Sequence, residues 1–360
     1  MGLHFTVEPA TAPATSGRRA EILADPGFGR FYTDHMVTAR WTRDNGWHDA
    51  KLGPYGPLVL DPATQVFHYA QSIFEGFKAY AQPDGSIATF RPAANGDRFN
   101  RSAARLALPA LPVEDFVTAA DLLVRQDAEW VPTAPGTALY LRPFMMATDV
   151  NLGVRPAHEV TFLVIASPSA SYFAGGARPV TIWLSEDYTR AAPGGTGAAK
   201  CAGNYAASLV AQQEAIDNGC DQVVFLDAVE RRWVEELGGM NVWFVLDDGR
   251  LVTPELTGSI LEGVTRDTIL TLARDLGYEV EERRVDVDEW RKGVEDGRIT
   301  EVFACGTAAI IASIGTLRWR NGEVTLGGPT PVAELIRQSL VDIQRGIAPD
   351  THDWMHPVVG

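Results

Sequence analysis

The sequence predicts an α/β protein of the α+β type with two domains, and three observations lead to this fold class. A length of 360 residues suits about two domains, and a hydrophobic content of 46% is ample for a sizeable core. Runs of β-branched and aromatic residues alternate with stretches whose apolar residues recur at helical spacing. No internal repeat or low-complexity tract is evident.

The first half of the chain predicts a small N-terminal α/β domain over residues 1–168. Its clearest helix is NGDRFNRSAARLAL, residues 95–108. Arginines at positions 98, 101 and 105 follow helical spacing, a pattern that usually marks a solvated face. Four runs predict strands: GPLVLD (56–61), SIATFRP (86–92), ALYLRPF (138–144) and EVTFLVIAS (159–167).

Residues 169–180 are rich in Ser, Ala, Gly and Pro, and we predict that they link the two domains. The larger C-terminal domain is then expected to span residues 181–360. It begins with the strand TIWLSEDYTR and continues with a helix that ends at Gly219. The strand DQVVFLD follows, and NVWFVLDDGRLVTP carries an Asp-Gly turn that predicts a hairpin.

Charge and composition limit the partners. With 46 acidic and 31 basic side chains, the net charge of −15 argues against nucleic acid or anionic lipid as a ligand. No run reaches the ~18 apolar residues of a membrane span, and no secretory signal pattern is present, so we expect a cytoplasmic protein without a membrane partner. Three scattered cysteines favour a reducing compartment. His352 and His356 have no further ligand nearby, so no metal site is expected.

The stretch GTGAAKCAGNY, residues 195–205, sets Lys200 among glycine and alanine. An ordinary solvated lysine in a loop fits this stretch. A reactive amine fits it as well, because small neighbours leave room for a bulky ligand and partial burial favours the neutral, nucleophilic form. The eleven residues alone leave both interpretations open.

Several features elsewhere suit an anionic ligand. The predicted helix GVTRDTILTLARDLG (263–277) offers backbone amides at Val264 and Thr265, and FACGTAAIIAS (303–313) carries a Gly-Thr-Ala turn. In VEELGGMN (234–241), one of Glu235 and Glu236 would normally point to solvent, whereas the other needs a partner if it is buried. Each feature is ordinary when taken alone. No P-loop, dinucleotide fingerprint or Gly-x-Ser-x-Gly elbow is complete.

Together these motifs resemble a known family. AAKCAGNY, EELGGMNVWFV, GVTRDTIL and FACGTAA are similar to the large domain of the fold-type IV enzymes that use pyridoxal 5′-phosphate. The upstream FHYAQSIFEGFKAY, FRPAANGDRFNRSAARLALP and LYLRPFM narrow the resemblance to branched-chain amino acid aminotransferases. It extends from about Phe28 to the final helix TPVAELIRQSLVDIQRG, and implies a small and a large domain with the cofactor between them.

The resemblance implies roles around the cofactor. Lys200 would bind it covalently and, once displaced by substrate, carry the proton between the substrate Cα and the cofactor. Tyr205 would hydrogen-bond its phenolic oxygen, and Glu236 would keep the pyridine nitrogen protonated. The phosphate would be held by Arg98, the amides of Val264 and Thr265, and Thr307.

Substrate recognition, by the same resemblance, must accept both a branched apolar side chain and the carboxylate of glutamate. Phe28, Tyr69 and Tyr172 would form apolar walls, with Tyr69 reaching across from a second subunit, so a homodimer is implied. Tyr140 and Ala308 would place the α-carboxylate, and Arg142 would meet the glutamate side chain. Arg190 matches a family residue near the active site whose role is left open.

The implied reaction exchanges an amino group between L-leucine, L-isoleucine or L-valine and 2-oxoglutarate, and it suits branched-chain amino acid biosynthesis as well as breakdown. Some members carry a Cys-x-x-Cys pair where this chain has Ala309 and Ala312, so thiol regulation of that kind is not expected. A D-amino acid aminotransferase or aminodeoxychorismate lyase would use the same lysine and glutamate. A non-catalytic phosphate-binding protein would need neither residue.

Overall fold

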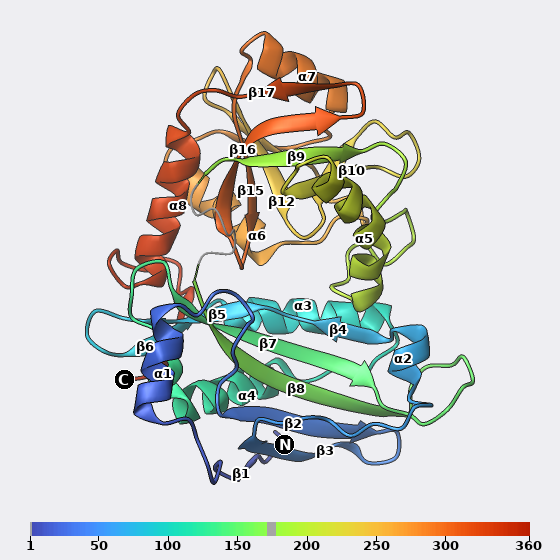
Figure 1. Cartoon of the computed structure of the whole chain (residues 1–360), viewed down its shortest axis with the longest axis vertical. Helices are drawn as coiled ribbons and strands as arrows, with labels where there is room; N and C mark the ends of the chain where they lie inside the picture. The colour runs from blue at the N-terminus through green and yellow to red at the C-terminus, as the bar shows by residue number, and fades with distance from the viewer. Residues whose placement is uncertain (1, 171–177) are drawn as a thin grey trace. The chain divides into compact units, whose positions relative to one another are not determined.

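The computed structural model of the chain describes residues 2–170 and 178–360. The chain divides into two compact units (Figure 1). Unit 1 comprises Met1–Ala174, Ala199–Ala202 and Asp342–Gly360, and unit 2 comprises Gly175–Ala198 and Gly203–Val341.

Unit 2 differs from the predicted C-terminal domain 181–360 at three places, because it begins at Gly175, leaves out Ala199–Ala202 and ends at Val341. The end of the chain belongs to unit 1 because β18 (Met355–Val359) pairs antiparallel with β6 (Ile87–Phe90). The short segment Ala199–Ala202, which contains Lys200, also belongs to unit 1, whereas the chain on either side of this segment belongs to unit 2.

Unit 1 is built on a mixed sheet, for which the described residues supply nine strands. Their order is β1-β3-β2-β8-β7-β5-β6-β18, with β4 paired to β7. The long pair β7–β8 forms the centre, and both strands are almost entirely buried. The other bounds are β1 (Thr6–Val7), β2 (His35–Thr42), β3 (Gly46–Pro54), β4 (Ser72–Phe74), β5 (Phe77–Ala81), β7 (Ala138–Ala147) and β8 (Glu159–Ser169).

The helices of unit 1 cover this sheet. Helices α3 (Pro92–Arg105) and α4 (Val113–Gln126) pack against each other, and α4 also contacts β2 and β8. Phe99 and Phe116 meet at 5.3 Å between ring centroids, and both lie close to Phe162 on β8. These buried rings form the centre of the core. The remaining helices are α1 (Ser16–Ala24), α2 (Gln65–Tyr69) and the 3₁₀ turn Ala128–Trp130.

One strand prediction in unit 1 is wrong. GPLVLD, residues 56–61, forms no strand, and Val59 is 98% exposed. The run shows apolar residues as a strand would, but Pro57 lacks an N–H, and no neighbouring strand pairs with the segment among the described residues. The other three predicted strands correspond to β6, β7 and β8.

Unit 2 contains a second mixed sheet, also of nine strands in the described residues. Their order is β11-β10-β9-β16-β15-β12-β13-β14, with β17 paired to β16. The predicted Asp-Gly hairpin is confirmed as β12–β13, in which Gly249 adopts a φ of 87°. The bounds are β9 (Val180–Ser185), β10 (Gln222–Leu226), β11 (Val234–Leu237), β12 (Asn241–Leu246), β13 (Leu251–Thr253), β14 (Val280–Glu282), β15 (Ile299–Gly306), β16 (Ile310–Trp319) and β17 (Gly322–Thr325).

Four helices accompany this sheet in the described part of unit 2. Small residues on α5, Ala211 and Ala215, pack with Trp183 and Phe225 on β9 and β10. Helices α6 and α7 contact β15, and Glu301 on β15 accepts hydrogen bonds from the first amides of α8. The bounds are α5 (Ala202–Asp217), α6 (Val264–Asp275), α7 (Val287–Glu295) and α8 (Pro331–Gln344).

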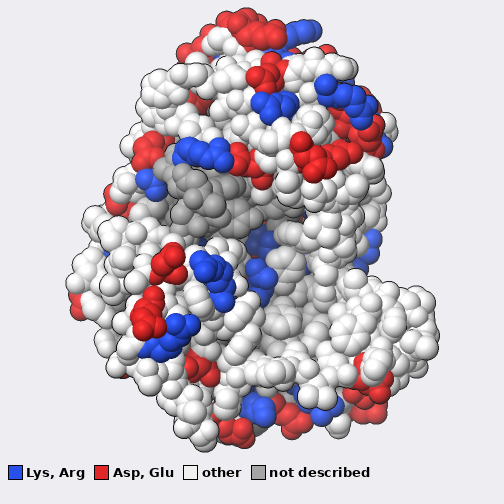
Figure 2. Space-filling model, in the orientation of Figure 1, with Lys and Arg blue, Asp and Glu red and all other residues white. Residues whose placement is uncertain are grey.

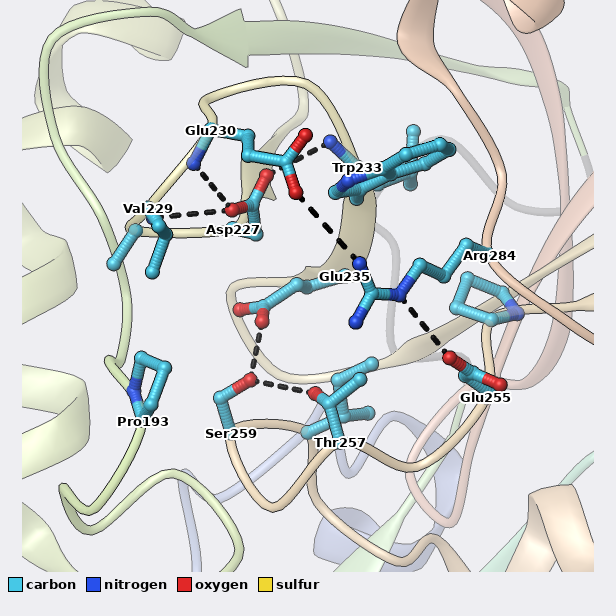
Figure 3. Close-up of a pocket in the computed structure, with 14 residues that line it drawn as sticks. Pro193, Asp227, Val229, Glu230, Trp233, Glu235, Glu255, Thr257, Ser259 and Arg284 are labelled. Carbon is cyan, nitrogen blue, oxygen red and sulfur yellow. Dashed lines mark hydrogen bonds and ion pairs between the residues drawn. The ribbon is translucent and has the colours of Figure 1, made fainter.

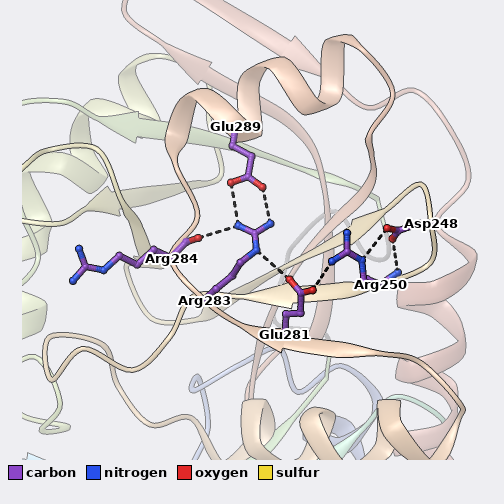
Figure 4. Close-up of polar contacts among 6 residues, drawn as sticks. All are labelled: Asp248, Arg250, Glu281, Arg283, Arg284 and Glu289. Atoms are coloured by element: carbon purple, nitrogen blue, oxygen red, sulfur yellow. Dashed lines mark hydrogen bonds and ion pairs between the residues drawn. The ribbon is translucent and has the colours of Figure 1, made fainter.

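A ladder of alternating charges ties the β12–β13 hairpin to β14 and α7 (Figure 4). Arg250 pairs with Asp248 at 2.8 Å and with Glu281. Glu281 also pairs with Arg283, whose guanidinium makes two hydrogen bonds to Glu289 at 2.7 and 3.1 Å. Acidic and basic side chains are likewise interspersed on the face drawn in Figure 2. Across residues 2–170 and 178–360, no helix has the length and apolar character needed to cross a membrane.

Candidate active site

Lys200 is held in unit 1 by its backbone. Its N–H donates to Ser102 Oγ on α3 at 2.9 Å, and its carbonyl accepts from the N–H of Phe74 at 3.0 Å. The next residue, Cys201, forms an antiparallel bridge with Ile73. The segment therefore adds a short piece of strand beside β4, and fixed backbone groups on both sides position the lysine.

The side chain of Lys200 lies over an aromatic ring that it shares with Arg142. Lys200 Nζ is 4.9 Å from the centroid of Phe74, and Arg142 Cζ is also 4.9 Å from that centroid. Arg142 Nη2 donates to Tyr140 Oη at 3.2 Å, and Phe28 packs edge-on against Tyr140 at 5.1 Å. Unit 1 thus brings Phe28, Tyr140 and Arg142 close together.

These residues border a cavity of about 70 Å³ in unit 1. Arg142 Nε is buried and has no hydrogen-bond partner among the described residues. A buried donor without a partner costs free energy, so this guanidinium is suited to an acceptor brought by a ligand. Tyr140 Oη lies against the backbone of Gly76, where a Cβ atom would come within 1.9 Å of it.

Arg98 is buried, so the predicted solvated face of its helix holds only for Arg101 and Arg105. Its guanidinium makes two hydrogen bonds of 2.8 Å to Glu75, which is fully buried. A guanidinium carries five N–H donors, and Glu75 uses two of them. The pair fixes the orientation of Arg98 and is compatible with a further anionic acceptor.

In unit 2, Glu236 is held by two neighbours. Arg190 Nη2 lies 2.5 Å from its Oε1, and the N–H of Leu261 donates to the same oxygen at 2.8 Å. Arg190 also donates to the carbonyls of Gly197 at 2.8 Å and Ser259 at 2.6 Å. Oε1 of Glu236 is thus in contact with a guanidinium and a backbone amide. This gives Arg190, whose role the sequence left open, a clear structural position.

Glu235 differs from the prediction that one glutamate of the pair would point to solvent. Glu235 is 5% exposed and Glu236 is 2% exposed. Successive residues of β11 point to opposite faces, and both faces are covered. Burial raises the pKa of the Glu235 carboxyl, against the opposing effects of its Ser259 hydrogen bond and of Arg190.

The remaining predicted residues of unit 2 lie near glycines whose backbone is closely approached by other groups. A Cβ atom at Gly263, just before α6, would come within 2.0 Å of Asn241 Oδ1. Asn241 in turn donates to the carbonyl of Leu261, next to the Glu236 contact. These contacts connect the amino end of α6, with Val264 and Thr265, to the Glu236 carboxylate.

A second set of approaches connects α5 to the turn between β15 and β16. A Cβ atom at Gly239 would lie 3.8 Å from Tyr205 Cε1 on α5. One at Gly306 would lie 3.6 Å from the carbonyl of Gly239. Thr307 and Ala308 follow directly in the turn. These approaches place Tyr205 beside Gly239, and Gly239 beside the residue that precedes Thr307 and Ala308.

Two predicted residues stand apart. Tyr69 is 40% exposed, and its hydroxyl donates to the carbonyl of Leu152. Tyr172 lies outside the described residues. Sequence reasoning missed Phe74, Glu75 and Ser102, which orient Lys200, Arg142 and Arg98. Only their place inside the quoted motifs FHYAQSIFEGFKAY and NGDRFNRSAARLAL could have indicated them.

Comparisons with known proteins find similar chains both in sequence and in fold. Residues 72–316 match the family model described as amino-transferase class IV. The chain is 60% identical over 353 residues to a probable branched-chain-amino-acid aminotransferase of Streptomyces coelicolor, with 97% of each chain covered. It is 56% identical over 359 residues to the branched-chain-amino-acid aminotransferase of Mycolicibacterium smegmatis, with 98% of each covered.

Solved structures of the T.th. branched-chain amino acid aminotransferase are also similar. The form with pyridoxamine 5′-phosphate superposes with a TM-score of 0.74 at 28% identity. The complexes with N-(5′-phosphopyridoxyl)-L-glutamate and with 4-methylvaleric acid give TM-scores of 0.71 and 0.73, each at 29% identity. Each comparison covers 89% of this chain and 99% of the other. The chain therefore belongs to the class IV aminotransferases, among their branched-chain-amino-acid aminotransferases.

Proposed function

We propose that the chain transfers the amino group of L-leucine, L-isoleucine or L-valine to 2-oxoglutarate, reversibly, with pyridoxal 5′-phosphate as cofactor. The observation that carries this proposal is the pair of anchored groups: Lys200, clamped by its backbone, and Glu236, ion-paired to Arg190. A protein that only bound a phosphate would need neither group.

The residues present suit this cofactor. A buried carboxylate that is paired with Arg190 can interact with a proton on a pyridine nitrogen. Gly263 brings no side chain to the amino end of α6, and Val264 and Thr265 begin the helix at its positive dipole end, a common phosphate site. Arg98 and Thr307 would add a guanidinium and a hydroxyl to the phosphate, and Tyr205 would donate to the phenolic oxygen.

Each residue then has a chemical task. When bound, pyridoxal 5′-phosphate supplies an electron sink for the charge left on the substrate Cα after proton loss. Lys200 Nζ would take the proton from the substrate Cα and deliver it to the cofactor. The backbone of Lys200 is fixed, whereas its long side chain can move between these two places. The family resemblance also assigns Tyr140 and Ala308 to placement of the substrate α-carboxylate.

Substrates of two kinds require a pocket with two characters. Phe28 and Tyr140 offer apolar ring surface to a branched side chain. Arg142, with its buried Nε, offers a cation to the side-chain carboxylate of glutamate. The T.th. relative has been solved both with a glutamate adduct and with 4-methylvaleric acid, a branched apolar acid, which supports the same dual use here.

We further propose a homodimer, on the evidence of an exposed apolar surface around α2 and residues 150–154. Tyr69 bonds to the carbonyl of Leu152, and Gln65 Nε2 donates to that of Gly153, so the loop and the helix form one surface. Contiguous exposed apolar surface commonly marks a protein interface. Light scattering of the Leu152→Asp, Val154→Asp double variant should then report a monomer. The exposed apolar members of this surface are Phe67, Tyr69, Val150, Leu152 and Val154.

The proposed reaction is tested by the absorption spectrum of the purified holoenzyme. A band in the visible or near-ultraviolet region should shift when L-leucine is added and shift back with 2-oxoglutarate. D-leucine and D-alanine serve as matched controls. A shift with the D-amino acids and none with L-leucine would replace the proposal with the D-amino acid alternative.

The role of Lys200 is tested by borohydride reduction of the holoenzyme and peptide mapping. The sequence contains four lysines, and Lys78 is the strongest rival, because burial lowers its pKa to about 8. The cofactor label is expected on Lys200 alone. Label on Lys51, Lys78 or Lys292 would overturn the assignment. Lys200→Ala should abolish transamination while the cofactor still binds noncovalently.

A further inference from the structure

A second cavity lies in unit 2, on the side of β11 that Glu235 faces (Figure 3). Its volume is about 200 Å³, comparable with a small organic molecule. The loop after β10, the segment before α6 and residue 284 surround it. Apolar walls come from Val229, Trp233, Pro254 and Ile260.

Glu235 is the buried polar group of this cavity. Ser259 Oγ donates to its Oε1, and Thr257 bonds to the same serine hydroxyl. Glu235 Oε2 is buried and has no hydrogen-bond partner among the described residues. The terminal torsion of glutamate is broad, so a small rotation presents this oxygen to the cavity. A carboxylate buried with an unused oxygen costs free energy unless a ligand or water supplies a donor.

The other charged groups of the cavity are already engaged. Asp227 accepts backbone hydrogen bonds from Val229, Glu230 and Trp233 and so braces the loop. Arg284 lies between two carboxylates, with Nε 3.2 Å from Glu255 and Nη1 3.7 Å from Glu230. The lining therefore has four carboxylates and one guanidinium, and its net negative charge favours a cation over an anion.

The cavity is connected to the Glu236 site through Ser259. The hydroxyl of Ser259 holds Glu235, whereas its carbonyl accepts from Arg190 Nη2, the group that pairs with Glu236. One residue, Ser259, therefore contacts both Glu235 and the arginine that pairs with Glu236. Glu235 and Glu236 themselves point to opposite faces of the strand.

We propose that this cavity is a second binding site, separate from the transamination site, for a small organic cation that carries N–H donors on an apolar body. The N–H group donates to Glu235 Oε2, and the apolar body packs against Trp233, Pro254 and Ile260. A cationic N–H group attached to an aromatic ring or an alkyl chain meets both requirements. Its apolar part then leaves no polar group against the apolar walls.

Benzamidine is a suitable probe, because it has amidinium N–H donors on a flat apolar ring. Isothermal titration calorimetry with the holoenzyme in its pyridoxamine form should detect binding of benzamidine. The neutral isostere benzamide should bind at least about tenfold more weakly. Glu235→Gln, which keeps the shape and the Ser259 contact, should weaken benzamidine binding by about tenfold or more. Glu279→Gln, an exposed carboxylate outside the cavity, is the matched control.

A rim variant keeps the test independent of the buried residue. Val229 is 74% exposed, so Val229→Lys should fold normally and weaken benzamidine binding through repulsion, whereas Val229→Gln should not. Equal affinity of the parent protein and Glu235→Gln would overturn the proposal. Displacement of benzamidine by 4-methylvalerate would also overturn it, because the probe would then occupy the substrate pocket.

Discussion

The guanidinium of Arg98 and the carboxylate of Glu75 meet side by side, with Nε bonded to Oε1 and Nη2 bonded to Oε2, each at 2.8 Å. Arg98 is 4% exposed and Glu75 is not exposed. Two such parallel hydrogen bonds restrain both rotation and translation of the guanidinium. An arginine held in this way is already oriented before an anionic ligand arrives.

Glu75→Ala is expected to lower the free energy of unfolding by about 3–5 kcal/mol, because it removes a carboxylate from a buried ion pair. Urea denaturation of the parent and variant proteins measures the change. The control is Glu334→Ala, which removes an exposed partner of Arg337 and should cost at most about 1 kcal/mol. Similar losses for the two variants would show that the buried pair adds nothing beyond surface attraction.

Glu236→Gln is expected to slow the proton-abstraction step by about 100-fold or more while the cofactor still binds. One pKa unit at the ring nitrogen corresponds to about 1.4 kcal/mol, and removal of the charge should shift that pKa by at least about two units. Single-turnover kinetics with L-leucine measures the rate. Glu235→Gln should have a far smaller effect, and a larger effect of Glu235→Gln would reverse the assignment of the two glutamates.

Arg142→Met should separate the two half-reactions. The leucine half-reaction should stay largely intact, whereas glutamate would bring an unpaired carboxylate into an apolar pocket. Truncation of one partner of a buried charge pair costs roughly 2–5 kcal/mol, or about 30-fold to several thousand-fold in selectivity. Single-turnover rates with each donor give the ratio. Equal losses would mean that Arg142 only braces Tyr140, with which it shares a hydrogen bond.

The buried Lys78 is expected to make the free energy of unfolding depend on pH. Burial lowers its pKa to about 8, below the value of 10.5 for a free side chain. Between these values the unfolded chain binds more protons than the folded chain, so the contribution of Lys78 makes stability rise with pH. Lys78→Met removes this contribution.

The comparison is urea unfolding at pH 7.5 and pH 9.5. At pH 7.5 the free energy of unfolding of Lys78→Met should exceed that of the parent. This difference should shrink by roughly 2 kcal/mol between pH 7.5 and pH 9.5. Lys292→Met, at an exposed position on α7, provides the control, with no change expected. An advantage that is constant or grows with pH would contradict the lowered pKa of Lys78.

The sequence predicted the fold class and most elements, because periodicity and turn residues are local signals. The Asp-Gly hairpin and the helix that ends before Gly277 are examples. The prediction of a strand at residues 56–61 was wrong because a strand needs a neighbouring strand to pair with as well as a suitable residue pattern. The C-terminal domain was predicted to extend to residue 360 for a related reason. Residues 355–359 pair with β6, which is distant in sequence, and local signals do not indicate such pairing.

The limits of the site prediction were similar. Motifs led to the proposal of Lys200, Glu236 and Arg98 as site residues, but they gave no information on which contacts hold these residues. The contacts of Ser102, Arg190 and Glu75 with them are set by packing between distant segments. The burial of Glu235 was missed because a two-residue pattern cannot show that both faces of a short strand are covered.

The pairing of β18 with β6 has a consequence for how the protein folds during its synthesis on the ribosome. On the ribosome, β6 emerges early, yet the strand that covers its edge is translated only after all of unit 2. Unit 1 therefore starts first and is completed last, and its open edge is available for pairing with other nascent chains in the meantime. Unit 2 can fold while that edge waits. Expression at lower temperature, or with slower initiation that spaces the ribosomes, should accordingly raise the soluble yield.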